Sequence, residues 1–106
     1  MLQIQKRFQK FSEDYPQVVK PYEVLGDAVH AAESVDEKTR ALIKLAISTG
    51  ARLEGAVHSH VRKALKAGCA DEEMHQVALR SLPTIGLPSM MVAWSWIDDI
   101  IEDKKK

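Results

Sequence analysis

The stretch from Ala51 to Gly68, ARLEGAVHSHVRKALKAG, carries the pattern that decides the fold of this chain. Its apolar residues recur at every third or fourth position, which is the spacing of one face of an α-helix. We expect a helix from about Arg52 to Ala67, with Gly68 as its terminator. At about 100° per residue, the side chains expected on its buried wedge are those of Leu53, Ala56, His60 and Ala64, with Val57 beside them.

The region before this stretch predicts two further helices. Apolar residues step by three or four up to Tyr15, and Pro16 interrupts the pattern because proline has no backbone N–H to donate. A second helix follows, with Pro21 suited to its first turn. The residues that carry these two patterns are Leu2 or Ile4, Phe8, Phe11 and Tyr15, then Val18, Tyr22, Leu25 and Val29.

A third helix is predicted between these two and the opening stretch. Ser34 followed by Glu37 is typical of a capping box at a helix start, and Asp36 is an alternative cap. We expect this helix to end near Gly50, a residue that readily adopts the left-handed conformation.

The third helix is apolar on more than one side, since Leu42, Leu45 and Ala46 form one stripe and Ile43 and Ile47 lie on another. A helix that is apolar on most of its circumference is surrounded by protein. A chain of this length buries only about two-thirds of its unfolded surface, which is little for covering such a helix. We therefore expect a homo-oligomer in which another subunit covers part of this helix, with Trp94 and Trp96 of the last helix contributing. The alternative is a monomer whose first two helices wrap the third.

The C-terminal part predicts two more helices and completes the fold class. Negative charge at Asp71, Glu72 and Glu73 favours a helix start, because it complements the helix dipole. A break is expected where Pro83, Gly86 and Pro88 occur. The last helix has one apolar side, made of Met90, Ala93, Trp94, Ile97, Ile100 and Ile101. The sequence thus predicts an all-α fold of about six helices, forming one domain over residues 1–106.

Composition excludes several classes of function. The 15 Lys and Arg residues balance the 15 Asp and Glu residues, which argues against an electrostatic nucleic-acid binder. No apolar run approaches the roughly 20 residues that span a bilayer, and cations in LQIQKRFQKF interrupt any signal-peptide core. Cys69 is the single cysteine, so an intrachain disulfide and a multi-cysteine metal site are excluded. The expected compartment is the cytoplasm.

Two histidines of the opening stretch are candidates for proton transfer, because an unperturbed imidazole titrates near neutrality. His60 lies on the apolar wedge, where burial would favour its neutral form and leave it able to act as a base. His58 lies nearly opposite, aligned with Glu54 and Arg62 four residues away on either side.

Each histidine also has an interpretation without chemistry. A lone histidine on an apolar face, such as His60, is usually a packed residue whose ring nitrogens have partners. His58 with Glu54 and Arg62 is more typical of a solvated charged face. A metal site with both histidines is not expected, because zinc-binding pairs on a helix lie four residues apart and these lie two apart.

The order and spacing of several short motifs around His60 resemble the carboxymuconolactone decarboxylase and alkylhydroperoxidase D proteins. The resemblance covers most of the chain, with its core from about Val35 to Val77. It implies an all-helical fold and assembly as a symmetric homotrimer or homohexamer. The residues that carry it are Tyr15-Pro16, Asp36-Glu37-Lys38-Thr39-Arg40, Leu42-Ile43, His60, Ala64-Leu65, Ala67-Gly68 and Glu72-Glu73, with the break from Pro83 to Pro88.

The redox branch of this family uses a Cys-x-x-Cys-x-x-x-His motif and a glutamate on the preceding helix. When its histidine is aligned with His60, the cysteines fall at Leu53 and Ala56 and the glutamate at about Ala41. Thiol peroxidase activity needs a thiolate nucleophile and a resolving thiol, so the alkylhydroperoxidase alternative is disfavoured. Cys69 lies beyond the helix terminator, where a small residue at a turn is the simpler interpretation.

The decarboxylase branch lacks the cysteine pair and works without a metal or cofactor. The resemblance therefore implies acid–base chemistry on a small carboxylated molecule of the lactone type, with His60 as the catalytic residue. Arg52, His58 and Arg62 are the candidate substrate-binding partners for its carboxylates, and Glu54 is placed to orient His58. The alternative from another class is a non-catalytic helical oligomer that binds a small ligand, because fold alone does not fix function.

Overall fold

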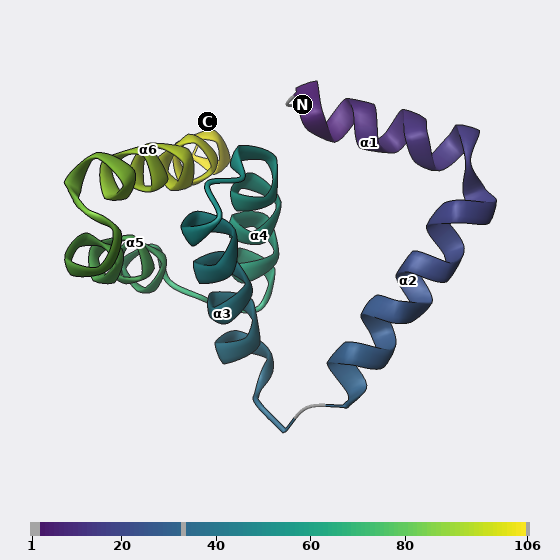
Figure 1. Cartoon of the computed structure of the whole chain (residues 1–106), viewed down its shortest axis with the longest axis horizontal. Coiled ribbons are helices and arrows are strands. Elements are labelled where there is room, and N and C mark those ends of the chain that lie inside the picture. The colour runs from purple at the N-terminus through teal and green to yellow at the C-terminus, as the bar shows by residue number, and fades with distance from the viewer. Residues whose placement is uncertain (1–2, 33, 106) are drawn as a thin grey trace. The chain divides into compact units, whose positions relative to one another are not determined.

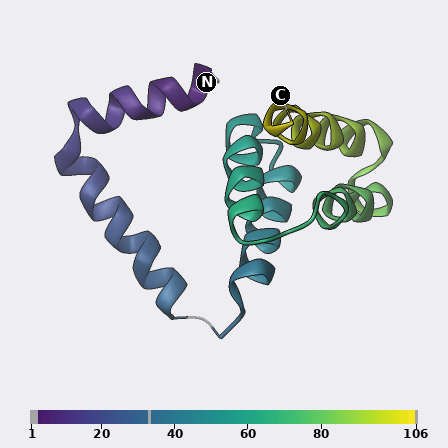
Figure 2. The same cartoon turned by 180° about the vertical axis from the view of Figure 1, so that it is seen from behind.

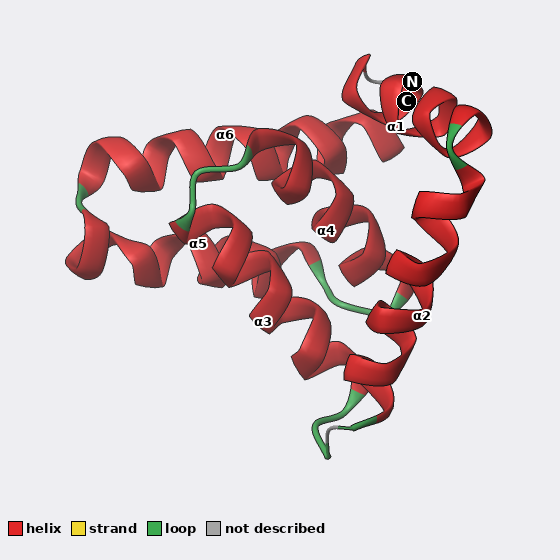
Figure 3. Cartoon of the chain, turned by 45° about the vertical axis from the view of Figure 1, so that its right-hand side comes forward, coloured by secondary structure: helices red, strands yellow, loops and turns green. Residues whose placement is uncertain are grey.

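The computed structural model describes residues 3–32 and 34–105, and over these residues it is built from helices joined by short connections (Figures 1 and 3). This confirms the all-α class and the expected number of helices among the described residues. The helices are α1 (Gln3–Asp14), α2 (Pro16–Ala31), α3 (Glu37–Gly50), α4 (Glu54–Lys66), α5 (Asp71–Ile85) and α6 (Leu87–Lys104). They fall into two compact units, Met1–Val35 and Asp36–Lys106. No helix within residues 3–32 and 34–105 is long and apolar enough to cross a bilayer.

The first unit consists of α1 and α2, which contact each other. Pro16 begins α2, where its missing N–H leaves no hydrogen bond unmade. The expectation that Pro21 opens this helix is therefore wrong, since Pro21 lies inside it. Val19 is buried, whereas the apolar residues that carry the predicted helical spacing are more than half exposed: Val18, Tyr22, Leu25 and Val29. Leu2 lies outside the described residues.

The second unit packs α3, α4, α5 and α6 around one hydrophobic core. Helix α4 contacts both α3 and α6, and α5 likewise contacts both of these helices. The two views in Figures 1 and 2 show α3 and α4 side by side, with α5 and α6 joined by a short turn. The largest fully buried side chains come from all four helices and are those of Leu45, Val57, Val61, Met74 and Ile97. This core fixes the position and rotation of every helix that carries a candidate site residue.

The start of α3 is capped by Asp36, the alternative of the two predicted caps. The Thr39 backbone N–H donates a 2.7 Å hydrogen bond to Asp36 Oδ1, and this bond lowers the pKa of the Asp36 carboxyl. The Ser34 capping box is wrong, because Glu37 is the first residue of the helix and Asp36 takes the cap position.

The junction between α3 and α4 also differs from the prediction. Helix α3 ends at Gly50 as expected, but the residue in the left-handed region is Arg52, with φ of 58°. The Arg52 Nη1 donates a 2.8 Å hydrogen bond to Ser89 Oγ. Arg52 is an uncommon residue for this conformation, since a Cβ atom there meets the following carbonyl oxygen.

The remaining helix ends agree with the sequence. Gly68 ends α4 with φ of 92°, and Gly86 separates α5 from α6 with φ of 93°. The Glu73 side chain accepts a 2.8 Å hydrogen bond from the Ala70 backbone N–H at the start of α5. The apolar side of α6 is confirmed, because Met90, Ala93, Ile97, Ile100 and Ile101 are buried and Trp94 is half-buried against the core.

The strained backbone at Arg52 leads to a stability prediction. Arg52→Gly and Arg52→Ala both remove the hydrogen bond to Ser89, but only glycine adopts positive φ without a steric penalty. We expect Arg52→Gly to have the larger free energy of unfolding by about 1 kcal/mol. Urea denaturation followed by circular dichroism measures this difference. Equal stability of the two variants would contradict the left-handed assignment.

Candidate functional site

The rotation of α4 decides which of its histidines faces the core. The buried residues of this helix are Val57, His58, Val61 and Ala64. Leu53, expected on the buried wedge, is 54% exposed. Ala64 of the predicted wedge and Val57 beside it are buried as expected, whereas Ala56 and His60 are only partly buried, so the buried side is turned toward Val61 and His58. Val57 and Val61 on this side are both fully buried in the core.

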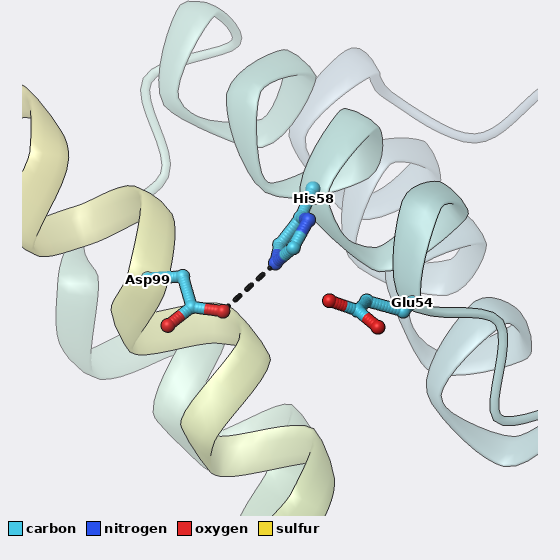
Figure 4. A group of neighbouring side chains, drawn as sticks. All are labelled: Glu54, His58 and Asp99. Carbon is cyan, nitrogen blue, oxygen red and sulfur yellow. Dashed lines mark hydrogen bonds and ion pairs between the residues drawn. The ribbon is translucent and has the colours of Figure 1, made fainter. Parts of the chain in front are cut away.

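His58 is the buried histidine, with an exposed fraction of 6%. Its Nε2 lies 3.0 Å from Asp99 Oδ2 on α6, as Figure 4 shows. This contact is a hydrogen bond, which satisfies a polar ring that would otherwise be costly to bury. The prediction that His58 lies on a solvated charged face is thus wrong.

Glu54 completes this group from one turn earlier on α4. Residues four apart share a helix face, so the carboxylate of Glu54 points toward the His58–Asp99 pair (Figure 4). One ligand-type atom from each of the three residues lies within 4.8 Å of the other two. The predicted proximity of Glu54 and His58 is confirmed. Sequence analysis missed Asp99, which is 41 residues from His58 and reaches it through the packing of α4 against α6.

His60 is half-buried and lies about 200° around α4 from His58. Burial, together with the positive charges of Lys63 and Lys44, lowers its pKa from the ordinary 6.5 to about 4. The imidazole is therefore neutral at physiological pH, as expected for a histidine removed from water. Lys44 comes from α3, so the surroundings of His60 are built by both helices.

Arg52 and Arg62 are the other two residues predicted to bind substrate. The Arg52 guanidinium is exposed and bonded to Ser89, at the junction before α4. Arg62 is half-buried on α4. The two lysines beside His60 are cations that sequence analysis missed. The i, i+3 spacing of His60 and Lys63 was a signal for one of them, whereas Lys44 has no such signal.

A second histidine–aspartate pair links α5 to α6. His75 Nε2 lies 2.6 Å from Asp98 Oδ1, and the imidazole stacks on the ring of Trp94 with centroids 4.4 Å apart. Asp98 and Asp99 are consecutive residues, so α6 presents one carboxylate to α5 and the next to α4. Sequence analysis could not place His75, since its partner is on another helix.

Cys69 is not arranged as a reactive thiol. It is buried, and its Sγ lies 3.8 Å from the carbonyl oxygen of Lys38. Burial and the negative charge of Glu73 raise its pKa above the ordinary value. A peroxidase nucleophile needs the opposite shift and access to peroxide. This geometry supports the interpretation of Cys69 as a packed turn residue.

Comparisons with known proteins agree with this architecture. The fold is similar to that in the crystal structure of the apo form of a carboxymuconolactone decarboxylase family protein from Legionella pneumophila. The TM-score is 0.79 at 23% identity, over 93% of this chain and 88% of that one, so the likeness concerns the fold. A Haemophilus influenzae protein described as uncharacterized is 34% identical over 61 residues, which are 58% of this chain and 54% of the relative. The chain thus spans about half the length of that curated relative.

The family itself is established by the sequence profile. The profile of the carboxymuconolactone decarboxylase family matches residues 16–99, which include all of α2 to α5 and most of α6. The match contains His60 and both histidine–aspartate pairs. The chain therefore belongs to the carboxymuconolactone decarboxylase family.

Proposed function

We propose that this protein carries out cofactor-free acid–base chemistry on a small carboxylated molecule of the lactone type, with His60 as the catalytic residue. The observation that carries the proposal is the surroundings of His60: a half-buried, neutral imidazole whose pKa is lowered by burial and by the charges of two lysines. A neutral ring has a lone pair for a proton, and the cations attract a carboxylate to the same place.

Lys44 and Lys63 are the proposed carboxylate-binding residues at His60. Arg52, His58, Arg62 and Glu54 stay predictions from the sequence, and His58 and Arg62 lie on another side of α4 from His60. Their charges lower the pKa of His60. A bound carboxylate neutralises part of that positive charge and favours the protonated imidazole. Substrate binding thereby moves the pKa of His60 up toward physiological pH, where a histidine both accepts and donates protons efficiently.

The proposed reaction is the loss of carbon dioxide from a carboxylated lactone. The bond between the ring carbon and the departing carboxylate breaks, and its electron pair moves toward the lactone carbonyl. His60, protonated once the bound carboxylate has raised its pKa, then delivers this proton to carbon and regains one from water. The lysines bind a carboxylate that stays on the product, because stabilising the departing one would oppose its loss.

The test is turnover of carboxymuconolactone and related carboxylated lactones, followed by carbon dioxide release. We expect His60→Gln to lower kcat by about 10²-fold or more, the usual contribution of a positioned acid–base group. Lys63→Gln should mainly raise KM, since it weakens carboxylate binding.

His75→Gln is the control, because it removes a different partly buried histidine. Unchanged turnover in His60→Gln would overturn the assignment. Saturable binding of these carboxylates with no turnover by the wild-type protein would support the non-catalytic ligand-binding alternative instead.

The lowered pKa of His60 also predicts how stability depends on pH. Between about pH 6.5 and pH 4 the unfolded chain binds a proton at His60 that the folded chain does not. The free energy of unfolding therefore declines as the pH falls through this window. We expect a smaller decline for His60→Gln than for the wild-type protein in urea denaturation series at about pH 7 and about pH 5. Identical declines would show that the folded imidazole titrates normally.

We also propose that the chain assembles with itself, as a trimer or hexamer, through the exposed apolar side of α3. Ile43 is 46% exposed and Ile47 is 66% exposed, on a helix whose opposite side fills the core through Leu45. Adjacent exposed isoleucines are costly in water, and a second subunit would remove them from it. Trp96, half-buried on α6, is a further proposed contact. The cytoplasm stays the predicted compartment.

Sedimentation of Ile47→Glu tests this assembly. A buried charge at the proposed contact is strongly unfavourable, so we expect the mass to fall toward the 11.9 kDa of one chain. Leu87→Glu is a matched control, because it adds the same charge at another exposed apolar residue. A wild-type protein that sediments as a monomer at micromolar concentration would contradict the proposal.

A further inference from the structure

We propose that Glu54, His58 and Asp99 bind one divalent transition-metal ion, for which zinc is the best-suited ion. The three side chains converge from α4 and α6 in Figure 4. They supply one imidazole nitrogen and two carboxylate oxygens. This site is separate from the chemistry proposed at His60, which lies on another side of α4.

The donor set matches the ligands that zinc takes in proteins. Zinc binds histidine nitrogen and carboxylate oxygen at about 2.0–2.2 Å, and sites open to solvent use three protein ligands and a water. Oxygen-only ions such as calcium and magnesium do not use an imidazole. With one nitrogen and two oxygens, the order of affinities for divalent metals also favours zinc over manganese or iron.

The spacing of the three groups is close to that of a loaded site. Ligand atoms around a tetrahedral zinc lie about 3.4 Å apart. His58 Nε2 and Asp99 Oδ2 are already 3.0 Å apart, so an ion can take the place of the hydrogen they share. The remaining spacings of up to 4.8 Å require a small inward movement of ligand atoms. Glu54 is exposed at the first turn of α4 and has the side-chain freedom to make it.

The burial of His58 and the two nearby carboxylates both favour the binding of a cation at this site. His58 is held by the core, with only 6% of its surface exposed, so its nitrogen is positioned before any ion arrives. Two carboxylates face this nitrogen, one from α4 and one from α6. A divalent ion balances both and is approached from the solvent side, where Glu54 and Asp99 are exposed.

The second histidine–aspartate pair of this chain serves as a control for the proposed metal site. His75 and Asp98 are the same pair of residue types at 2.6 Å, also joining a helix to α6. Among the described residues, however, only Glu54, His58 and Asp99 form a group of three such ligands. The nearby Asp71 is instead paired with Lys104 at 2.9 Å. The His75–Asp98 pair alone forms a hydrogen bond. The His58–Asp99 pair has Glu54 as a third ligand, and we expect a metal ion to need all three.

The experiment is calorimetric titration of zinc into the full-length, tag-free protein after treatment with a chelator. We expect saturable binding of one ion per chain. Glu54→Gln and Asp99→Asn should each weaken binding by about tenfold or more, because each removes a charged ligand. Both residues are exposed, so circular dichroism should confirm an intact fold. Zinc should also raise the melting temperature of the wild-type protein.

His75→Gln and Asp98→Asn are the matched controls, and zinc binding to them should equal that of the wild-type protein. Three results would overturn the proposal: no saturable zinc binding at micromolar concentration, full affinity in Glu54→Gln, or equal loss of affinity in the control variants. None of these results bears on His60, since its turnover and pH dependence are measured without added metal.

Discussion

The packing of α4 against α6 is the constraint on which the rest of the structure depends. Val57 and Val61 of α4 and Ile97 of α6 are fully buried in one cluster, and these side chains set the rotation of both helices. Because close-packed cores tolerate little displacement, neither helix can turn without opening a cavity. In this rotation His58 is buried, and His60 lies on a side of α4 where the charge of Lys44 from α3 acts on it. The surroundings of both histidines therefore depend on how these two valines pack.

The elements of the fold could be predicted from the sequence because their signals are local. Gly68, Gly86 and the apolar side of α6 each act through backbone conformation or helical spacing within a few residues. The errors at the helix starts are also local: Asp36 and Ser34 compete for one cap, and Arg52 takes a conformation that glycine more commonly adopts. Such competitions are decided by small energy differences, which a residue pattern does not reveal.

The candidate site could be predicted only in part, because its rotation and its partners are not local. Helical spacing shows that α4 has an apolar stripe, but two neighbouring wedges of this helix are nearly equally apolar. Which of the two wedges is buried depends on the helices that pack against α4. Because the other wedge is buried, His58 lies in the core and not at the surface as expected. Asp99 and Lys44 lie on other helices, so no spacing within α4 could indicate them. His60 and Glu54 could be singled out because the reasons for choosing them lie in the sequence around them.

The two histidines of α4 illustrate how one helix can hold opposite electrostatic environments. The charges of Lys63 and Lys44 act on His60, which favours an anion on its side of the helix. His58 faces two carboxylates, so a cation is attracted to that side. The chain as a whole has 15 cationic and 15 anionic residues, so its net charge gives no sign of these two environments. The difference between them is in the local electric field at each histidine. An anionic substrate near His58 would meet like charges in Glu54 and Asp99. A metal near His60 would meet like charges in the lysines. The sign of the local field thus directs each proposed ligand to a different face of α4.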